Sequence, residues 1–289
     1  MNRHLHYKTK AKLIIIPGLS GFLFFYAFPM AVSLYYSLID NNFRRNFVGF
    51  NNYAGLFENE YYALAFSNTL AFTAVGTALL LLFSFVVSVM FVYAGKRFSA
   101  LRAALILPML LPTAGIALVW RGLFNPGGAL SAFTMTEPGL ASRMLAPQLL
   151  PLYLIFVWKY GGLAVVLVTG AIYGVDKSVY EAAAVDGARG IKLHALITAP
   201  MIRPTIFFTL VLTAANSFNI YREVFYLFGG DYPPDAAYLL QHFMNNHFRR
   251  LNYQTLSSGA LVFVAVLLAL ISILYFWDNR KAAPQRGME

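Results

Sequence analysis

The sequence predicts an all-α polytopic membrane protein with six transmembrane helices, and three observations lead to that prediction. Hydrophobic residues make up 59% of the chain and charged residues 12%, against about 25% charged in an ordinary soluble domain. The mean hydropathy is +0.61. Stretches without any charged residue recur along the chain, and a bilayer core needs about 20 such residues per helix. We therefore expect a single transmembrane domain over residues 1–289.

Six segments satisfy the length requirement, namely 13–39, 66–93, 102–121, 150–174, 204–228 and 257–277. The first is too long for the apolar part of a signal peptide and no small-residue cleavage site follows it, so we expect it to stay uncleaved. The third is the shortest, bracketed by Arg102 and Arg121. The fourth contains the charge of Lys159, and the fifth contains Arg222 and Glu223 near its end.

Prolines inside these segments predict kinks or breaks, because proline lacks the backbone N–H that a helix interior requires. They are Pro17, Pro29, Pro108, Pro112 and Pro151. Glycine, proline and asparagine in the third and fifth connections predict turns there.

The distribution of Lys and Arg predicts the orientation of the chain. The amino terminus, the 94–103 and 175–203 loops and the tail carry fourteen of these residues, whereas the opposite side carries six. Both termini are therefore expected in the cytoplasm. The net charge of +10 does not indicate nucleic-acid binding, because the basic residues flank apolar runs and form no basic face.

Signatures of catalysis and of metal binding are absent from the sequence. The chain has no cysteine, and its five histidines lack the spacing of a metal site, so that His242 and His247 are expected at the surface of an outside loop. The Gly95-Lys96 pair lacks the rest of a phosphate-binding loop. We therefore expect no catalytic residue, metal site or cofactor in this chain, and any ATP and Mg²⁺ on a partner.

A polar excursion of about thirty residues, 175–204, separates the fourth and fifth segments. It predicts a first helix that is capped by Asp176 or Ser178 and ends at Gly187. A second helix is expected from Ile191 to Thr198, ended by Pro200. By itself this pattern is compatible with a docking element or with a solvated loop.

The residues of this excursion, EAAAVDGARGIKLHALITAPMIRP, resemble the EAA loop of membrane subunits of binding-protein-dependent ATP-binding-cassette (ABC) importers. The matching positions are Glu181, Ala182, Ala183, Asp186, Gly187, Ala188, Ile197 and Pro200. Two positions depart from the pattern, since Ala199 replaces leucine and His194 stands where an aromatic or aliphatic residue is common. FYAFPMAVSLYYSLID, FVGFNNYAGLF, SNTLAFT and LILPMLLPTAGIALVWRGLFNPGGAL are similar to the first permease of the maltose and glycerol-phosphate type, whereas Phe228-Gly229-Gly230-Asp231 departs from it.

The resemblance implies a type I ABC importer permease in a bacterial cell membrane. It implies a second homologous permease, two ABC ATPase subunits, an extracytoplasmic solute-binding protein and a sugar as partners, besides membrane lipid. It assigns contact with the ATPase, or its geometric support, to a coupling helix with Glu181, Ala182, Ala183, Asp186, Gly187 and Pro200.

The same resemblance places a sugar pathway along the fourth and fifth segments, at Lys159, Tyr160, Leu163, Asn216, Ser217, Asn219 and Tyr221, and Arg222 joins this set as a second cation. Hydrogen bonds between helices are the alternative role for these polar groups. Lys159 and Arg222 would favour an acidic sugar, unless Lys159 reaches to the membrane surface or the charge of Arg222 is cancelled by Glu223 or by a neighbouring subunit. The rival function is a stand-alone secondary transporter or channel for a small polar solute, and the identity of the sugar stays open.

Overall fold

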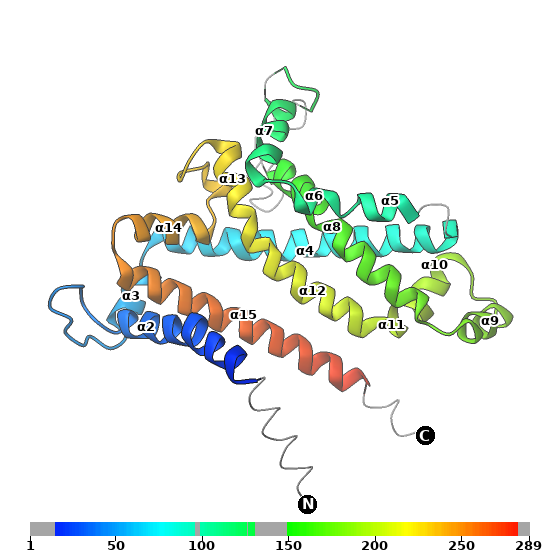
Figure 1. The fold of residues 1–289 in the computed structure, drawn as a ribbon, viewed down its shortest axis with the longest axis horizontal. Helices are drawn as coiled ribbons and strands as arrows, with labels where there is room; N and C mark the ends of the chain where they lie inside the picture. The colour runs from blue at the N-terminus through cyan, green and yellow to red at the C-terminus, as the bar shows by residue number, and fades with distance from the viewer. Residues whose placement is uncertain (1–14, 96–98, 126, 131–148, 283–289) are drawn as a thin grey trace, which may run out of the picture. The chain divides into compact units, whose positions relative to one another are not determined.

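The computed structural model describes residues 15–95, 99–125, 127–130 and 149–282 (Figure 1). These residues form helices and turns with one isolated β-bridge between Ile39 and Phe47, which confirms the all-α prediction. Four helices are long and apolar enough to cross a membrane, and six if each of two bent pairs counts as one span. By contacts the described chain divides into residues 64–242 and the residues on either side of that range. The two terminal segments 1–14 and 283–289, where part of the orientation prediction falls, lie outside the described residues.

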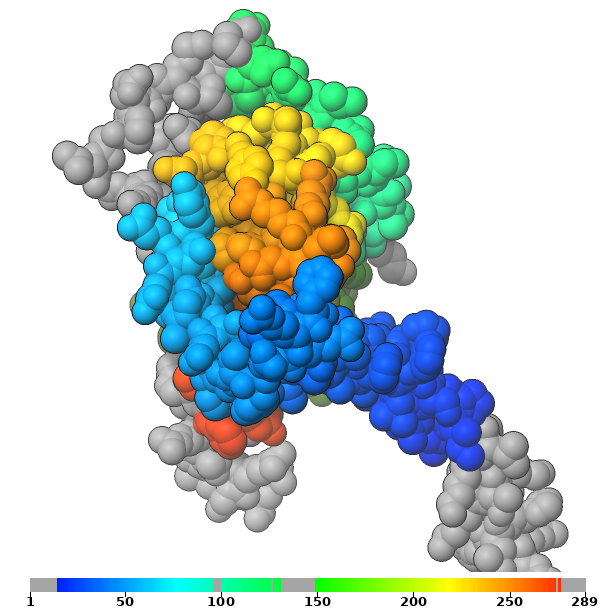
Figure 2. Space-filling view, turned by 90° about the vertical axis from the view of Figure 1, so that its left-hand side faces the viewer, coloured from blue at the N-terminus to red at the C-terminus, as the bar shows by residue number. Residues whose placement is uncertain are grey.

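The unit that contains both ends of the described chain is built around α2 (Phe28–Ser37), α3 (Asn51–Phe57) and α15 (Tyr253–Ala282). α15 packs along α2 and against α3 (Figure 1). The side-chain amide of Asn52 donates to the carbonyl oxygens of Ser37 and Ile39 at 2.9 and 2.8 Å, so α3 closes the end of α2. No residue in the most apolar window of the first span, Ile15–Ser37, is buried, and this helix is dark blue in Figure 2.

Prolines are accommodated within two helical runs by a local widening of the helix. A π-helical turn, η1 (Leu23–Ala27), precedes Pro29, and a second one, η5 (His194–Thr198), precedes Pro200. Because proline supplies no N–H and its ring crowds the carbonyl four residues earlier, a π-turn at that place keeps the run helical without a clash. The expected disturbance at Pro29 is therefore a widened turn.

In the other unit, buried side chains of α4 (Glu60–Ala94) and α8 (Leu150–Tyr173) share the main hydrophobic core, and α12 (Arg203–Ser217) packs along α8. α8 is the most enclosed of them, with 67% of its most apolar window buried. Its two adjacent glycines allow this, because a Cβ on Gly162 would lie 1.7 Å from the carbonyl oxygen of Leu105. Small residues permit such close approach of helices in membranes.

The third predicted span, 102–121, is a broken helix, as its prolines predict. It consists of α5 (Ser99–Ala104), α6 (Leu107–Leu110) and α7 (Thr113–Phe124), with a bend of 99° between the two halves. Leu111 is extended, with ψ 144°, because the residue before a proline is disfavoured in the α region. Pro112 thus breaks the helix, as the proline pattern indicates.

The polar excursion and the fifth span form the second bent pair. α9 (Lys177–Val185) is followed by α10 (Gly190–Leu193), η5 and α11 (Ala199–Met201), and a bend of 79° near Ile202 leads into Arg203–Phe228. That last run comprises α12, the 3₁₀ turn η6 (Phe218–Ile220) and α13 (Tyr221–Phe228). The second helix of the excursion therefore continues past Pro200, which occupies the first turn of α11, where proline is tolerated.

The segment after the fifth span is folded back onto the start of α4. The amide of Asn68 donates to the carbonyl oxygens of Asp235 and Tyr238, and the hydroxyl of Thr69 accepts from the backbone N–H of Leu240. His242, at the start of α14 (Leu240–Arg249), is fully buried beside these bonds, so its predicted surface position is wrong. Burial lowers the pKa of His242 to about 4. His247 is half-buried.

Candidate functional site

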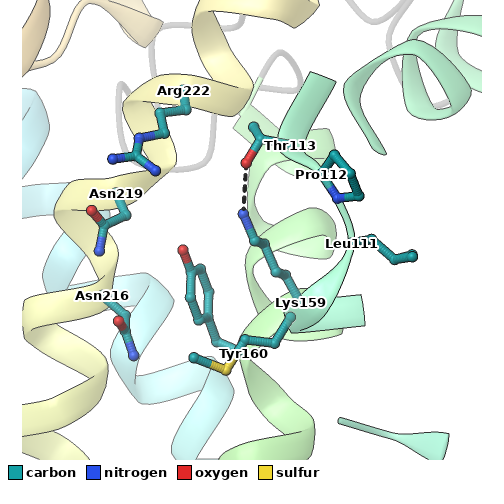
Figure 3. Close-up of a pocket in the computed structure, with 9 residues that line it drawn as sticks. Leu111, Pro112, Thr113, Lys159, Tyr160, Asn216, Asn219 and Arg222 are labelled. Atoms are coloured by element: carbon teal, nitrogen blue, oxygen red, sulfur yellow. Dashed lines mark hydrogen bonds between the residues drawn. The ribbon is translucent and has the colours of Figure 1, made fainter. Parts of the chain in front are cut away.

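A cavity of about 420 Å³ lies among the third, fourth and fifth spans, within residues 64–242 (Figure 3). Five of the predicted pathway residues line it, namely Lys159, Tyr160, Asn216, Asn219 and Arg222. The residues from the fifth span are spaced by three and pass through the 3₁₀ turn η6, in which positions i and i+3 lie on one face. Figure 3 shows these three side chains along one side of the cavity, opposite Thr113 and Pro112.

Three predicted pathway residues lie elsewhere. Leu163 does not line the cavity and is half-buried on α8. The hydroxyl of Ser217 is buried and lies 2.7 Å from the hydroxyl of Thr73 on α4, which is the hydrogen bond between helices that was the alternative role. The ring of Tyr221 packs 5.0 Å from the His242 ring, away from the cavity.

The break in the third span supplies lining residues that the sequence pattern does not single out. Met109, Leu111, Pro112 and Thr113 complete the cavity wall. Their signal in the sequence is Pro112 itself, because an extended residue before a proline opens the backbone of a span and such openings are tolerated where they line a cavity.

Lys159 is buried and bonded on two sides. Its ammonium group forms a salt bridge with Glu223, and it donates to the hydroxyl of Thr113 at 3.1 Å (Figure 3). The side chains of Lys159 and Glu223 are 8% and 0% exposed. Lys159 therefore joins α8 to α7 and α13, and its charge is compensated within the protein. Among the described residues, Glu223 Oε2 has no hydrogen-bond partner.

Arg222 is the cavity cation that keeps its charge uncompensated. Successive residues of a helix point about 100° apart, so Arg222 faces the cavity while Glu223 faces α8. The carboxylate of Glu223 forms its salt bridge with Lys159, and no salt bridge joins it to Arg222 within the described residues. The guanidinium is exposed and forms no hydrogen bond or ion pair within the described part of the chain. Two carboxamides, of Asn216 and Asn219, stand on the same face and offer both donors and acceptors.

The predicted coupling residues form a second, separate surface. Asp176 caps α9 by accepting from the backbone N–H of Ser178 at 2.9 Å, and this hydrogen bond lowers the pKa of its carboxyl. Gly187 ends the helix with φ +80°, and the backbone N–H groups of Gly187 and Ala188 donate to the carbonyls of Ala184 and Ala183. This is a Schellman motif, in which glycine is favoured because an L side chain strains the left-handed conformation.

Exposure separates the coupling residues into two groups. Glu181, Ala182, Asp186, Gly187 and Pro200 are exposed, whereas Ala183 is buried. His194 holds the second helix of the excursion to α4, since its Nε2 lies 2.9 Å from the hydroxyl of Tyr93 and its Nδ1 lies 3.1 Å from that of Thr198. The departure of His194 from the family pattern thus corresponds to a polar anchor.

Comparison with known proteins shows which family the chain resembles. Residues 99–283 match the family described as binding-protein-dependent transport system inner membrane component. The chain is 26% identical over 280 residues to the sn-glycerol-3-phosphate transport system permease protein UgpA of Yersinia pestis bv. Antiqua (strain Antiqua). The aligned region covers 94% of this chain and 95% of the relative. The chain is 32% identical over 214 residues to UgpA of Salmonella choleraesuis (strain SC-B67), over 71% of this chain and 72% of the relative.

Solved structures agree with that placement at the level of the fold. A bacterial ABC transporter involved in the import of the acidic polysaccharide alginate matches with a TM-score of 0.76 and 20% identity, over 96% of this chain and 99% of that chain. The alginate transporter in complex with an alginate pentasaccharide-bound periplasmic protein matches with a TM-score of 0.77 and 18% identity, over 96% of both chains. The resemblance read from the sequence is therefore confirmed, and the chain belongs to the family of binding-protein-dependent transport system inner membrane components.

Proposed function

We propose that this chain is the permease subunit of an ATP-driven importer that moves an anionic saccharide or a phosphorylated polyol across a bacterial cytoplasmic membrane. The cavity at Arg222 is the place where the solute is held during alternating access. A second permease, two ATPase subunits that bind ATP and Mg²⁺, and an extracytoplasmic binding protein complete the transporter. Both chain termini face the cytoplasm, in accord with the Lys and Arg distribution.

The exposed apolar side chains of the polar excursion support docking to an ATPase. Val185 and Ile191, on either side of the Gly187 turn, are 88% and 87% exposed. Exposed apolar residues on a segment that leaves the membrane are typical of a protein contact. Glu181 and Asp186 stand beside them and offer charge to a basic partner.

The uncompensated charge of Arg222 is the observation that carries the choice of an anionic solute. Lys159 is neutralised by Glu223, so Arg222 sets the charge that a solute meets in the cavity. A guanidinium binds carboxylate and phosphate in two-pronged geometry, and the neighbouring carboxamides suit hydroxyl groups. The named solutes of the relatives, sn-glycerol 3-phosphate and alginate, are both anions that carry free hydroxyl groups.

Substitution of Arg222 in the assembled transporter tests this proposal. Loss of a charge-assisted hydrogen bond costs about 1.5–3 kcal/mol, so Arg222→Gln is expected to weaken transport of sn-glycerol 3-phosphate or an alginate oligosaccharide by about tenfold or more. Arg222→Lys should keep part of it. The readout is uptake into proteoliposomes together with solute-stimulated ATP hydrolysis.

The matched comparison uses glycerol and a neutral malto-oligosaccharide as solutes. Transport of neutral solutes that is lost in parallel with that of anions in Arg222→Gln would contradict the anionic assignment. Uptake by the chain alone, without ATPase subunits, would contradict the importer and favour a secondary transporter.

A further inference from the structure

A second cavity, of about 370 Å³, lies between α5 and α8 in the same unit. It shares no lining residue with the cavity at Arg222. Its wall is formed by Arg102, Ala103, Ile106, Val166, Thr169, Gly170 and Tyr173. No step of the proposed transport uses these residues.

Most of the surface of this wall is apolar, and part of it is left open by a glycine. A Cβ added to Gly170 would meet no atom within 4 Å. Gly162, on the same helix, contrasts with it, because there a Cβ would collide with the Leu105 carbonyl. The space beside Gly170 is therefore room for a ligand, and its lining of Ile106 and Val166 suits a hydrocarbon chain.

A buried hydroxyl in the wall lacks a partner. Thr169 is 3% exposed, and its Oγ1 has no hydrogen-bond partner among the residues that the structure describes. The carbonyl of Val165, four residues earlier, is the usual acceptor for a helical threonine, but it accepts from the hydroxyl of Ser88 at 3.0 Å. The Thr169 hydroxyl is thus available to donate to an ester or phosphate oxygen.

The guanidinium of Arg102 is fixed at the edge of the cavity. It lies 5.7 Å from the ring centroids of both Phe91 and Tyr173, and one of its terminal nitrogens donates to the Gly95 carbonyl at 2.9 Å. Its Nε is buried and has no partner within the described residues. No carboxylate forms an ion pair with Arg102 in that part of the chain. A held cation with an unsatisfied donor is complementary to an anion.

We propose that this cavity binds an anionic phospholipid, with an acyl chain beside Gly170 and the phosphate on Arg102. Arg102 lies at the start of the third span, next to the basic 94–103 loop, and basic pockets between transmembrane helices on the cytoplasmic side bind anionic headgroups. A tyrosine at the end of α8 belongs to the membrane–water boundary, where a headgroup lies. Free phosphate would leave the aliphatic wall uncovered. The assignment to the cytoplasmic leaflet rests on the proposed orientation, whereas the binding itself does not.

Native mass spectrometry of the delipidated transporter, titrated with dioleoyl-phosphatidylglycerol or dioleoyl-phosphatidylethanolamine, tests the proposal. Wild type is expected to retain phosphatidylglycerol in preference to phosphatidylethanolamine. Arg102→Gln should reduce that preference by about fivefold, the equivalent of one cation near a membrane surface, and Arg102→Lys should retain most of it. Gly170→Leu fills the space for the chain and should abolish the retained lipid.

Gly18→Leu is the matched control, because a Cβ on Gly18 also meets nothing within 4 Å and Gly18 lies on the first span, outside this unit. It should bind lipid as wild type does. Equal retention of the two lipids by wild type, full retention in Gly170→Leu, or displacement of the lipid by millimolar inorganic phosphate would each overturn the proposal. A crosslink from Gly170→Cys to the second permease, with no lipid bound, would also overturn the proposal, because a protein would then cover the cavity. Failure of the Arg222 test would leave this outcome unaffected.

Discussion

At the scale of single residues, Lys159 has a role different from the one that its position within an apolar span suggests. A lysine within an apolar span is by default a candidate for a solute site. Here a partner carboxylate one span away, Glu223, removes its charge from the cavity. The adjacent residue, Arg222, is thereby left as the cation that a solute meets. A single carboxylate therefore decides which of two cations is available.

Removal of either partner of this ion pair should destabilise the protein. Lys159→Met or Glu223→Leu leaves a buried charge without its partner, a change that costs about 3–5 kcal/mol. The double variant removes both charges and is expected to recover most of that stability. Thermal unfolding of the purified chain in detergent, followed by circular dichroism, measures the effect.

The double variant is also the control for a role in solute binding. If it unfolds like wild type and still transports anions, the pair acts in packing. Two single variants that are as stable as wild type would contradict the buried pair.

At the scale of elements, the Schellman turn at Gly187 sets the direction of the excursion between α9 and α10. The glycine is exposed and a Cβ would meet no atom, so its side chain is excluded by conformation and not by packing. Its φ of +80° lies in the left-handed region, where an L residue costs about 1–2 kcal/mol and a β-branched one is strained further.

We therefore expect Gly187→Val to lower transport and solute-stimulated ATP hydrolysis in the assembled transporter, while the protein still inserts in the membrane. Asparagine visits the left-handed region readily, so Gly187→Asn should keep much of both activities although its side chain is similarly large. Equal loss in the two variants would indicate that size, and not the turn, is what the ATPase contact requires. Normal coupling in Gly187→Val would remove Gly187 from the proposed coupling surface.

At the scale of the whole molecule, the sequence predicts where the spans lie along the chain better than it predicts the bends within them. Composition and long apolar runs find the four helices that could each cross a membrane, since membrane burial acts on each segment separately, and the third and fifth predicted segments correspond to the two bent pairs. The 99° break of the third span depends on where Pro112 falls relative to its neighbours, and the sequence indicates only that a disturbance occurs. The burial of His242 depends on a fold-back held by Asn68 and Thr69, which are far away in the chain.

In the candidate site too, features that depend on one helix are predictable from the sequence, and features that depend on contacts between helices are not. The resemblance to the family finds four lining residues and the charge of Arg222 adds a fifth, because side chains on one helical face stay together whatever the rest of the protein does. It misses Thr113 and misplaces Ser217, because both positions depend on contacts between different spans. The pairing of Lys159 with Glu223, and not Arg222 with Glu223, likewise follows from the packing of α8 beside the fifth span.

The absence of cysteine permits a direct test of the predicted orientation. Phe43 is 96% exposed on the side predicted to face outward, and Lys177 is exposed at the start of α9 on the side predicted to face the cytoplasm. A membrane-impermeant maleimide should label Phe43→Cys in intact cells and Lys177→Cys only after permeabilisation. The cysteine-free wild type is the control, and the reversed pattern would invert the topology.

The unequal burial of the membrane helices has a consequence for how much each one constrains its own sequence. Of the most apolar window, 67% is buried in α8, 33% in α4, 17% in Tyr253–Ile273 and none in Ile15–Ser37. A side chain that faces fluid hydrocarbon need only be apolar, whereas one enclosed by other side chains must also have the right shape. Within this chain, the first helix therefore requires of its residues little more than sufficient length and apolar character. In α8, the size and shape of each side chain are constrained as well.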